Sequence, residues 1–132
     1  MKKNGILNSE ISKVLSDLGH TDMITISDCG LPIPDGVEKI DISLKFGVPS
    51  FIETLKEILK DMKVEKIILA KEIINDNEII LKEIKKLIDK NIEIEFIEHE
   101  KFKKVTNKSK AIIRTGENTP FANIILVSGC IF

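Results

Sequence analysis

The stretch MITISDCGLPIP, at residues 23–34, contains the pattern that decides the fold. Its first five residues are mostly apolar or β-branched and carry no charge, which predicts a short buried strand. Asp28 ends that run, and the proline- and glycine-rich residues 29–36 predict an ordered loop. We therefore expect Asp28 to lie where a buried strand opens into a loop.

Strand and helix patterns alternate along the rest of the chain, which predicts an α/β layered sandwich around a mainly parallel sheet. Gly19 is expected to end the first helix in the left-handed conformation, and Ser50 with Glu53 forms a capping box at the start of the second. Ile79 is expected to face inward from a long third helix. The predicted strands cover residues 23–27, 39–43, 64–70, 92–97, 111–114 and 124–128, and the predicted helices cover residues 9–18, 51–62, 75–90 and 100–105.

Length and charge narrow the classes of protein to consider. A chain of 132 residues fits one domain. Lysine and arginine total 20 against 21 acids, a net charge of −1, so no long-range field favours nucleic acid or an anionic membrane. The N-terminus has no apolar run typical of a signal peptide, and no stretch is long enough to span a bilayer. We expect a cytoplasmic protein, in which the apolar Ile131 and Phe132 pack on the body or on a neighbouring subunit.

The motifs that hold common cofactors do not occur in this sequence. Cys29 and Cys130 form no CxxC pair, and no cysteine–histidine cluster has zinc spacing, so we expect free thiols and no metal. Neither GxGxxG nor Walker A follows a predicted strand, and there is no GxSxG elbow. We therefore expect chemistry without a cofactor.

Three titratable side chains lie at the ends of predicted elements. Asp28 follows the first strand and His99 follows the strand ending at residue 97, and ligands of open α/β sheets gather at the carboxyl ends of strands. His20 precedes the first strand. Each has a simpler interpretation: a charge near a helix end, an Asx-turn or a helix cap. Together they suggest a site in which Asp28 stabilises protonated His20 as a general acid, if the loops bring the two together.

Residues 114–123, RTGENTPFAN, form a second candidate segment. Arg114 is the only arginine in the chain, and an internal ion pair with Glu117 is the simplest interpretation of it. The amide of Asn123 suits a sugar hydroxyl. The ring of Phe121 either faces a pyranose or packs under the loop.

The chain resembles the D-ribose pyranase family, within the ribose/fucose mutarotase group, over residues 3–132. The order and spacing of seven segments carry the resemblance: GILNSEIS at 5–12, LGHTD at 18–22, DCGLPIP at 28–34, DISLKFGVPSF at 41–51, HEKFK at 99–103, IIRTGE at 112–117 and PFANIIL at 120–126.

The resemblance implies a Rossmann-like three-layer α/β/α fold and a cytoplasmic homo-oligomer, a decamer of stacked rings. It implies interconversion of the β-pyranose and β-furanose forms of D-ribose without cofactor or metal. His20 would be the proton donor. The sugar-binding residues would be Asp28, His99, Phe121, Ala122 and Asn123.

One departure concerns Phe121, where the family pattern has tyrosine. Activity survives the change if the phenol hydroxyl only orients sugar, whereas a proton-relay role would make this chain slower or shift its sugar preference. Two alternatives stay open: a mutarotase for another sugar such as fucose, and a non-catalytic sugar-binding protein.

Overall fold

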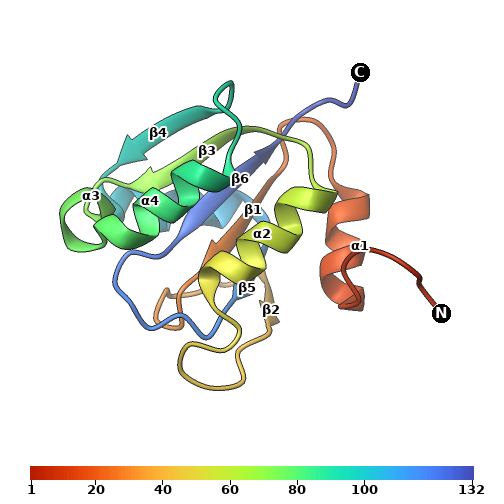
Figure 1. Cartoon of the computed structure of the whole chain (residues 1–132), viewed down its shortest axis with the longest axis horizontal. Coiled ribbons are helices and arrows are strands. Elements are labelled where there is room, and N and C mark those ends of the chain that lie inside the picture. Colours follow the sequence, from red (N-terminus) through yellow and green to blue (C-terminus); the bar gives the residue numbers. More distant parts are fainter.

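A computed structural model describes residues 1–132 and shows six strands in one mixed sheet (Figure 1). The spatial order is β2-β5-β1-β6-β3-β4, which places β1 and β6 at the centre. The strands are β1 Met23–Ser27, β2 Glu38–Asp41, β3 Val64–Ala70, β4 Glu93–Ile97, β5 Ser109–Arg114 and β6 Ile124–Ser128. The helices are α1 Ser9–Asp17, α2 Phe51–Asp61, α3 Ile73–Asp76, α4 Glu78–Leu87 and α5 His99–Val105, with a 3₁₀ turn at Thr106–Lys108.

Five of the six strands run in the same direction. The pairs β1–β5, β2–β5 and β3–β4 are parallel, and β6 is antiparallel to both of its neighbours, β1 and β3. The predicted α/β class is therefore confirmed, with one reversed strand at the centre of the sheet. Because of that reversal, the segment that enters β6 lies beside the loop that leaves β1.

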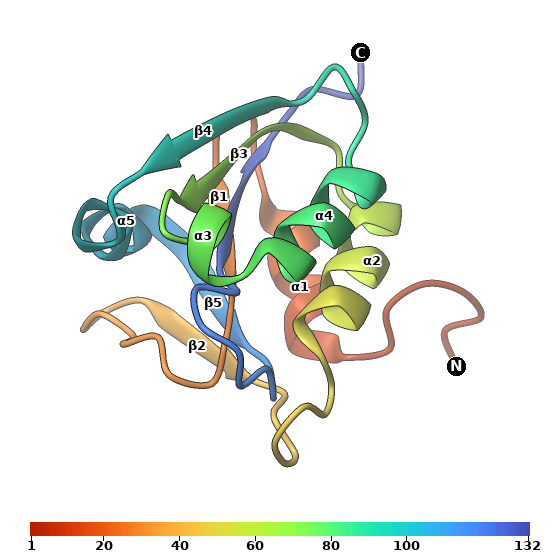
Figure 2. The ribbon, with the colours of Figure 1, turned by 60° about the vertical axis from the view of Figure 1, so that its left-hand side comes forward.

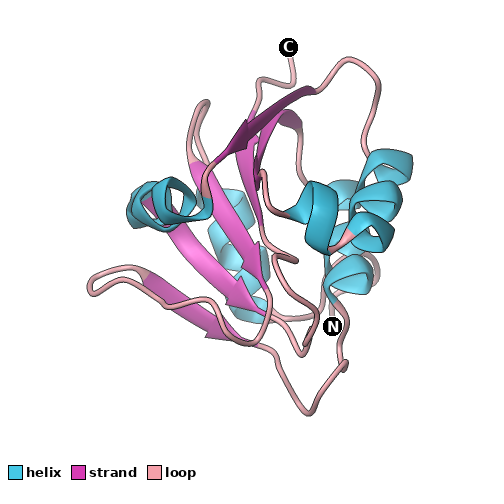
Figure 3. Ribbon diagram, turned by 90° about the vertical axis from the view of Figure 1, so that its left-hand side faces the viewer, coloured by secondary structure: helices cyan, strands magenta, loops and turns pink.

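Helices lie on both sides of the sheet, unequally. Figures 2 and 3 show α1, α2 and α4 against one face and α5 alone against the other. Ile24 and Ile26 of β1 point into the larger core with the three helices, whereas Phe102 of α5 packs in a smaller cluster with Ile112 and Ile125. Alternate residues of β6 likewise face different layers, Ile124 and Leu126 the larger core and Ile125 the smaller cluster.

Helix ends agree with the sequence pattern at two places and differ at two others. The Asn8 side chain caps α1, and the predicted capping box of Ser50 is present at the start of α2. The left-handed stop predicted at Gly19 is wrong: α1 ends at Asp17, its C-cap residue Leu18 is extended, and Thr21 carries the positive φ of 70°. The helix predicted at 75–90 is present as α4 but is shorter, because Asn77, with φ −151°, separates it from α3.

Three apolar side chains are exposed. The sequence pattern misplaces one of them and leaves the packing partner of the other two undecided. Ile79, predicted to face inward, is 77% exposed on α4. Ile131 and Phe132 do not pack on the body of their own chain, since they are 88% and 104% exposed.

The longest helix, α2, has 11 residues, and none of the helices combines the length and apolar composition needed to cross a membrane.

Candidate active site

Asp28 and Asn123 meet at the carboxyl end of β1. Asp28 directly follows β1 and Asn123 directly precedes β6, so the antiparallel pairing of these strands brings them together. The Asp28 N–H donates to Asn123 Oδ1 (2.9 Å), and Asn123 Nδ2 donates to Asp28 Oδ2 (2.7 Å). Asp28 Oδ1 also accepts the N–H groups of Gly30 and Leu31, each at 2.9 Å. The carboxylate is held in one orientation at the start of the loop.

Phe121 and His99 form the second part of this edge. The His99 ring lies edge-on to the ring of Phe121, with centroids 5.1 Å apart, and is stacked against Phe102 at 6.3 Å. His99 is the first residue of α5 and Glu98 is its N-cap, so the prediction that His99 lies in the loop before the helix is wrong by one position. Phe121 has a positive φ of 57°, and Ala122 beside it is fully buried in the larger core.

His20 lies at the opposite end of β1. Five residues of strand separate His20 from Asp28, a length of about 17 Å. His20 Nε2 contacts Glu65 Oε2 of β3 at 2.9 Å, and its side chain is 53% exposed. The loops therefore do not bring His20 and Asp28 of one chain together, which was the condition for the predicted acid–carboxylate pair within a single copy. In its place the carboxylate of Glu65, which the sequence analysis did not single out, holds the imidazole.

The surroundings of His20 are hollow and partly apolar. A cavity of about 370 Å³ at this end of the sheet is lined by His20, Leu18, Met62 and the terminal Ile131 and Phe132, among others. Figure 1 shows the C-terminus leaving the molecule at this end, beyond β6. The two terminal side chains therefore lie beside the imidazole rather than beside Asp28.

Arg114 does not pair with Glu117, contrary to the interpretation drawn from the sequence. Arg114 Nη1 contacts Asp41 Oδ2 at 2.8 Å, and its Nε donates to the carbonyl of Cys29 at 3.2 Å. The Ser43 hydroxyl, followed by Arg114, holds the pKa of Asp41 well below its usual range. Glu117 is buried and accepts hydrogen bonds from the Phe51 N–H and from Thr119. The hydrogen bonds of Arg114 and Glu117 thus stabilise the loops that follow β1 and β5.

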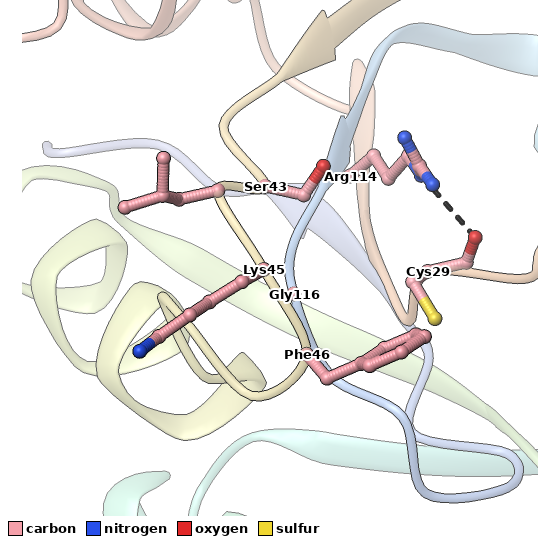
Figure 4. A pocket seen from close by; sticks show the side chains of 7 residues that line it. Cys29, Ser43, Lys45, Phe46, Arg114 and Gly116 are labelled. Carbon is pink, nitrogen blue, oxygen red and sulfur yellow. Dashed lines mark hydrogen bonds between the residues drawn. The ribbon is translucent and has the colours of Figure 1, made fainter.

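A second hollow, of about 310 Å³, opens between Cys29 and the loop that follows β2. Figure 4 shows the Phe46 ring directed toward the thiol of Cys29, while Lys45 points away. Phe46 is 80% exposed. No role for this loop was predicted from the sequence, although its residues belong to the 41–51 segment that carries the family resemblance.

Comparison with known proteins places this geometry in a family. Residues 1–131 match the model of the RbsD / FucU transport protein family. The chain belongs to the RbsD / FucU family. A family member from Bacillus cereus, a D-ribose pyranase, is 56% identical over 133 residues and is aligned over 100% of both chains.

Two solved structures superpose on this chain along almost its whole length. Bacillus subtilis RbsD complexed with D-ribose superposes with a TM-score of 0.97 at 53% identity, over 100% of both chains. The Streptococcus pneumoniae fucose mutarotase in complex with L-fucose superposes with a TM-score of 0.75 at 23% identity, covering 96% of this chain and 95% of that one. At that identity the second likeness concerns the fold alone.

Proposed function

We propose that this protein is a D-ribose pyranase, an isomerase that interconverts β-D-ribopyranose and β-D-ribofuranose. The observation that carries the proposal is the match to RbsD complexed with D-ribose, at 53% identity over the whole of both chains. The 56% identity to a curated D-ribose pyranase, again over full length, supports it. The fucose mutarotase is far less similar, at 23% identity, so ribose is favoured over fucose as the sugar.

The reaction requires two proton transfers. A base removes the proton of the anomeric hydroxyl while an acid protonates the ring oxygen, and the ring opens to an aldehyde. Another hydroxyl then attacks the carbonyl, and the transfers run in reverse. A positioned acid or base contributes about 10²–10⁴-fold. His20 is the proton donor in this proposal, with its imidazole presented to solvent and oriented by Glu65.

The sugar binds at the carboxyl edge of the sheet in this proposal. Asp28 is a fixed acceptor for sugar hydroxyls because three hydrogen bonds hold its carboxylate. His99 and Phe121, whose ring centroids lie 5.1 Å apart, provide an imidazole and an aromatic ring at the same edge of the sheet. Asn123 is 1% exposed and engages Asp28 with both amide atoms, so it acts by positioning Asp28. Ala122, fully buried, anchors the peptide between Phe121 and Asn123.

A complete site then needs two copies of the chain, since His20 and Asp28 lie at opposite ends of β1. We propose a homo-oligomer, a decamer of rings, in which His20 of one copy reaches the carboxyl edge of another. Exposed apolar side chains occur at both ends that would meet: Ile131 and Phe132 near His20, and Phe46 near Asp28. A contact between two different surfaces closes into a ring when its rotation permits.

The same proposal includes the domain organisation, the cellular location and the class of architecture expected from the sequence. Residues 1–132 form one D-ribose pyranase domain, which acts in the cytoplasm in ribose metabolism. Its architecture is grouped with three-layer Rossmann-like folds, in which α5 represents the second outer layer. No cofactor or metal takes part in the mechanism proposed.

Saturation-transfer NMR on equilibrated D-ribose tests the proposal, because it measures exchange between pyranose and furanose signals directly. We expect the protein to accelerate this exchange and His20→Ala to reduce it to the uncatalysed rate with the fold retained, since the side chain is 53% exposed. Binding of ribose without faster exchange would favour the non-catalytic sugar-binding protein. Faster exchange of fucose anomers than of ribose forms would favour the mutarotase alternative.

A further inference from the structure

The main-chain N–H of His99 is bound by a carboxylate from another loop. It donates to both oxygens of Glu72, at 3.0 and 3.1 Å. Glu72 follows β3 and His99 follows β4, and 27 positions separate them in the sequence. Glu98, the N-cap residue of α5, makes no side-chain hydrogen bond to the helix. Glu72 therefore takes the place of a cap for the first N–H of α5.

Two further contacts join the same pair of loops. The Lys71 N–H donates to the Ile97 carbonyl at 2.7 Å, which extends the β3–β4 pairing by one bond. Lys71 Nζ also contacts Glu98 Oε1 at 2.8 Å, but these side chains are 53% and 70% exposed. A pair exposed to this extent contributes little to stability. The half-buried Glu72 carboxylate is the one side chain of the two loops that bonds directly to His99.

The His99 ring itself has no such anchor. Its Nδ1 atom is buried and has no hydrogen-bond partner within the chain. The rings of Phe102 and Phe121 pack against the imidazole. The orientation of the imidazole thus depends on that packing and on the main chain from which it extends, and Glu72 holds that main chain.

We propose that Glu72 is a positioning residue for sugar binding, acting through the main chain of His99. The inference rests on the proposed function, since it assigns His99 to the sugar site. Without the Glu72 carboxylate, the His99 N–H turns to water, the first turn of α5 loosens and the ring shifts against Phe121. A displacement of about 1 Å in a site can cost roughly 100-fold in rate.

Kinetics of ribose exchange on the full chain test the inference. We expect Glu72→Ala to lower kcat/KM about 10- to 100-fold, mainly through a higher KM, because His99 binds sugar rather than donating the proton. Glu72→Gln keeps an oxygen that accepts the N–H and should restore KM to within about threefold of wild type. Glu98→Gln is the matched control: it removes the Lys71 ion pair without touching the His99 N–H, and KM should not change.

Imidazole NMR signals give a readout that does not depend on activity. The chain has only two histidines, so the His20→Ala variant assigns both sets of signals. We expect Glu72→Ala to shift the His99 signals, which lie beside two aromatic rings, and to leave those of His20 in place. If Glu72→Ala fails to fold, Glu72→Asp replaces it, because its shorter carboxylate falls short of the N–H and should raise KM.

The possible outcomes separate this inference from the proposed function. An active wild type whose Glu72→Ala variant keeps the wild-type KM and unmoved His99 signals would overturn the role of Glu72. A loss of activity that Glu72→Gln does not restore would overturn it as well. A wild type that does not accelerate ribose exchange, with His99 signals that still shift in Glu72→Ala, would instead overturn the proposed function.

Discussion

Asn123 and Asp28 bind each other through two hydrogen bonds of opposite direction, one from the Asp28 N–H to Asn123 Oδ1 and one from Asn123 Nδ2 to Asp28 Oδ2. Asn123 is 1% exposed, so its amide has no water as an alternative partner. An amide is the side chain of this size that supplies an acceptor and a donor together. A carboxylate in its place would present a second negative charge to Asp28.

We predict that Asn123→Asp destabilises the protein by about 1–3 kcal/mol at pH 7 and abolishes catalysed ribose exchange. Two carboxylates about 3 Å apart do not both ionise, so the loss of stability should shrink as the pH falls toward 4 and one of them binds a proton. Urea unfolding at pH 7 and near pH 4 measures the difference. Asn107→Asp, on the exposed 3₁₀ turn, is the control, and an equal loss in both variants would contradict the argument.

Mixing two inactive variants tests whether each site is shared between copies. We expect His20→Ala and Asp28→Asn to be inactive separately, because each removes one half of every site. Subunits unfolded and refolded together in equal amounts should recover about one quarter of the wild-type activity, the share of contacts that combine an intact His20 with an intact Asp28. Saturation-transfer NMR measures the recovery. If the mixture stayed inactive although mass spectrometry showed mixed oligomers, the shared site would be disproved.

Local patterns were sufficient for the elements in which every residue agrees with one structure. Strands β1 and β6 are confirmed at their predicted bounds, since both are short uncharged runs of mostly apolar or β-branched residues. The break at Asn77 could not be predicted in this way. Its amide Nδ2 donates to Thr119 Oγ1 and to the Pro120 carbonyl, each at 2.8 Å, from more than 40 positions away.

In the candidate site, too, some features could be predicted from local sequence patterns and others could not. Asp28 and His99 each follow the carboxyl end of a strand, as the sequence pattern predicts. That pattern could not pair His20 with Glu65, because that contact depends on β6 lying antiparallel between β1 and β3. The local sequence patterns of β1 and β3 do not show that an antiparallel strand lies between them. The same holds for Arg114, whose partner Asp41 lies 73 positions away.

Phe121 stands where the family resemblance leads us to expect a tyrosine, and its ring makes an edge-on contact with His99. We predict that Phe121→Tyr changes the rate of ribose exchange less than threefold, because the ring is kept and a half-buried position admits the hydroxyl. Phe121→Ala should lower kcat/KM about tenfold, since an aromatic pair contributes about 0.5–1.5 kcal/mol beyond its area. A gain of tenfold or more in Phe121→Tyr would instead mean that the hydroxyl relays a proton.

Gly116 supports the loop that carries Phe46. A Cβ at this position would lie 2.4 Å from the Lys45 carbonyl oxygen and 2.5–2.6 Å from main-chain atoms of Val48. Main chain cannot move aside as a flexible side chain can, so Gly116→Ala should destabilise the protein by about 1–3 kcal/mol. Chemical denaturation measures the loss. Gly19→Ala is the control, with its nearest contact at an ordinary 3.5 Å, and an equal loss there would contradict the explanation.

Asp41 should make part of the stability dependent on pH. The Ser43 hydroxyl and the Arg114 guanidinium hold its pKa well below the usual range. A carboxylate with a lowered folded-state pKa contributes stability that is fully present above its unfolded pKa, near 4, and is lost as the pH falls toward the folded value. We therefore predict that Asp41→Asn is less stable than wild type at pH 7 and that the difference narrows steadily below about pH 4.

Thermal unfolding of wild type and Asp41→Asn between pH 7 and pH 2 measures this narrowing. The side chain is 38% exposed, so high salt should reduce the difference at pH 7. Asp35→Asn is the matched control, because Asp35 is an exposed residue of the loop after β1 whose carboxylate forms no hydrogen bond or ion pair. A difference between Asp41→Asn and wild type that stayed constant down to pH 2 would show that the ionised carboxylate is not what stabilises this corner of the sheet.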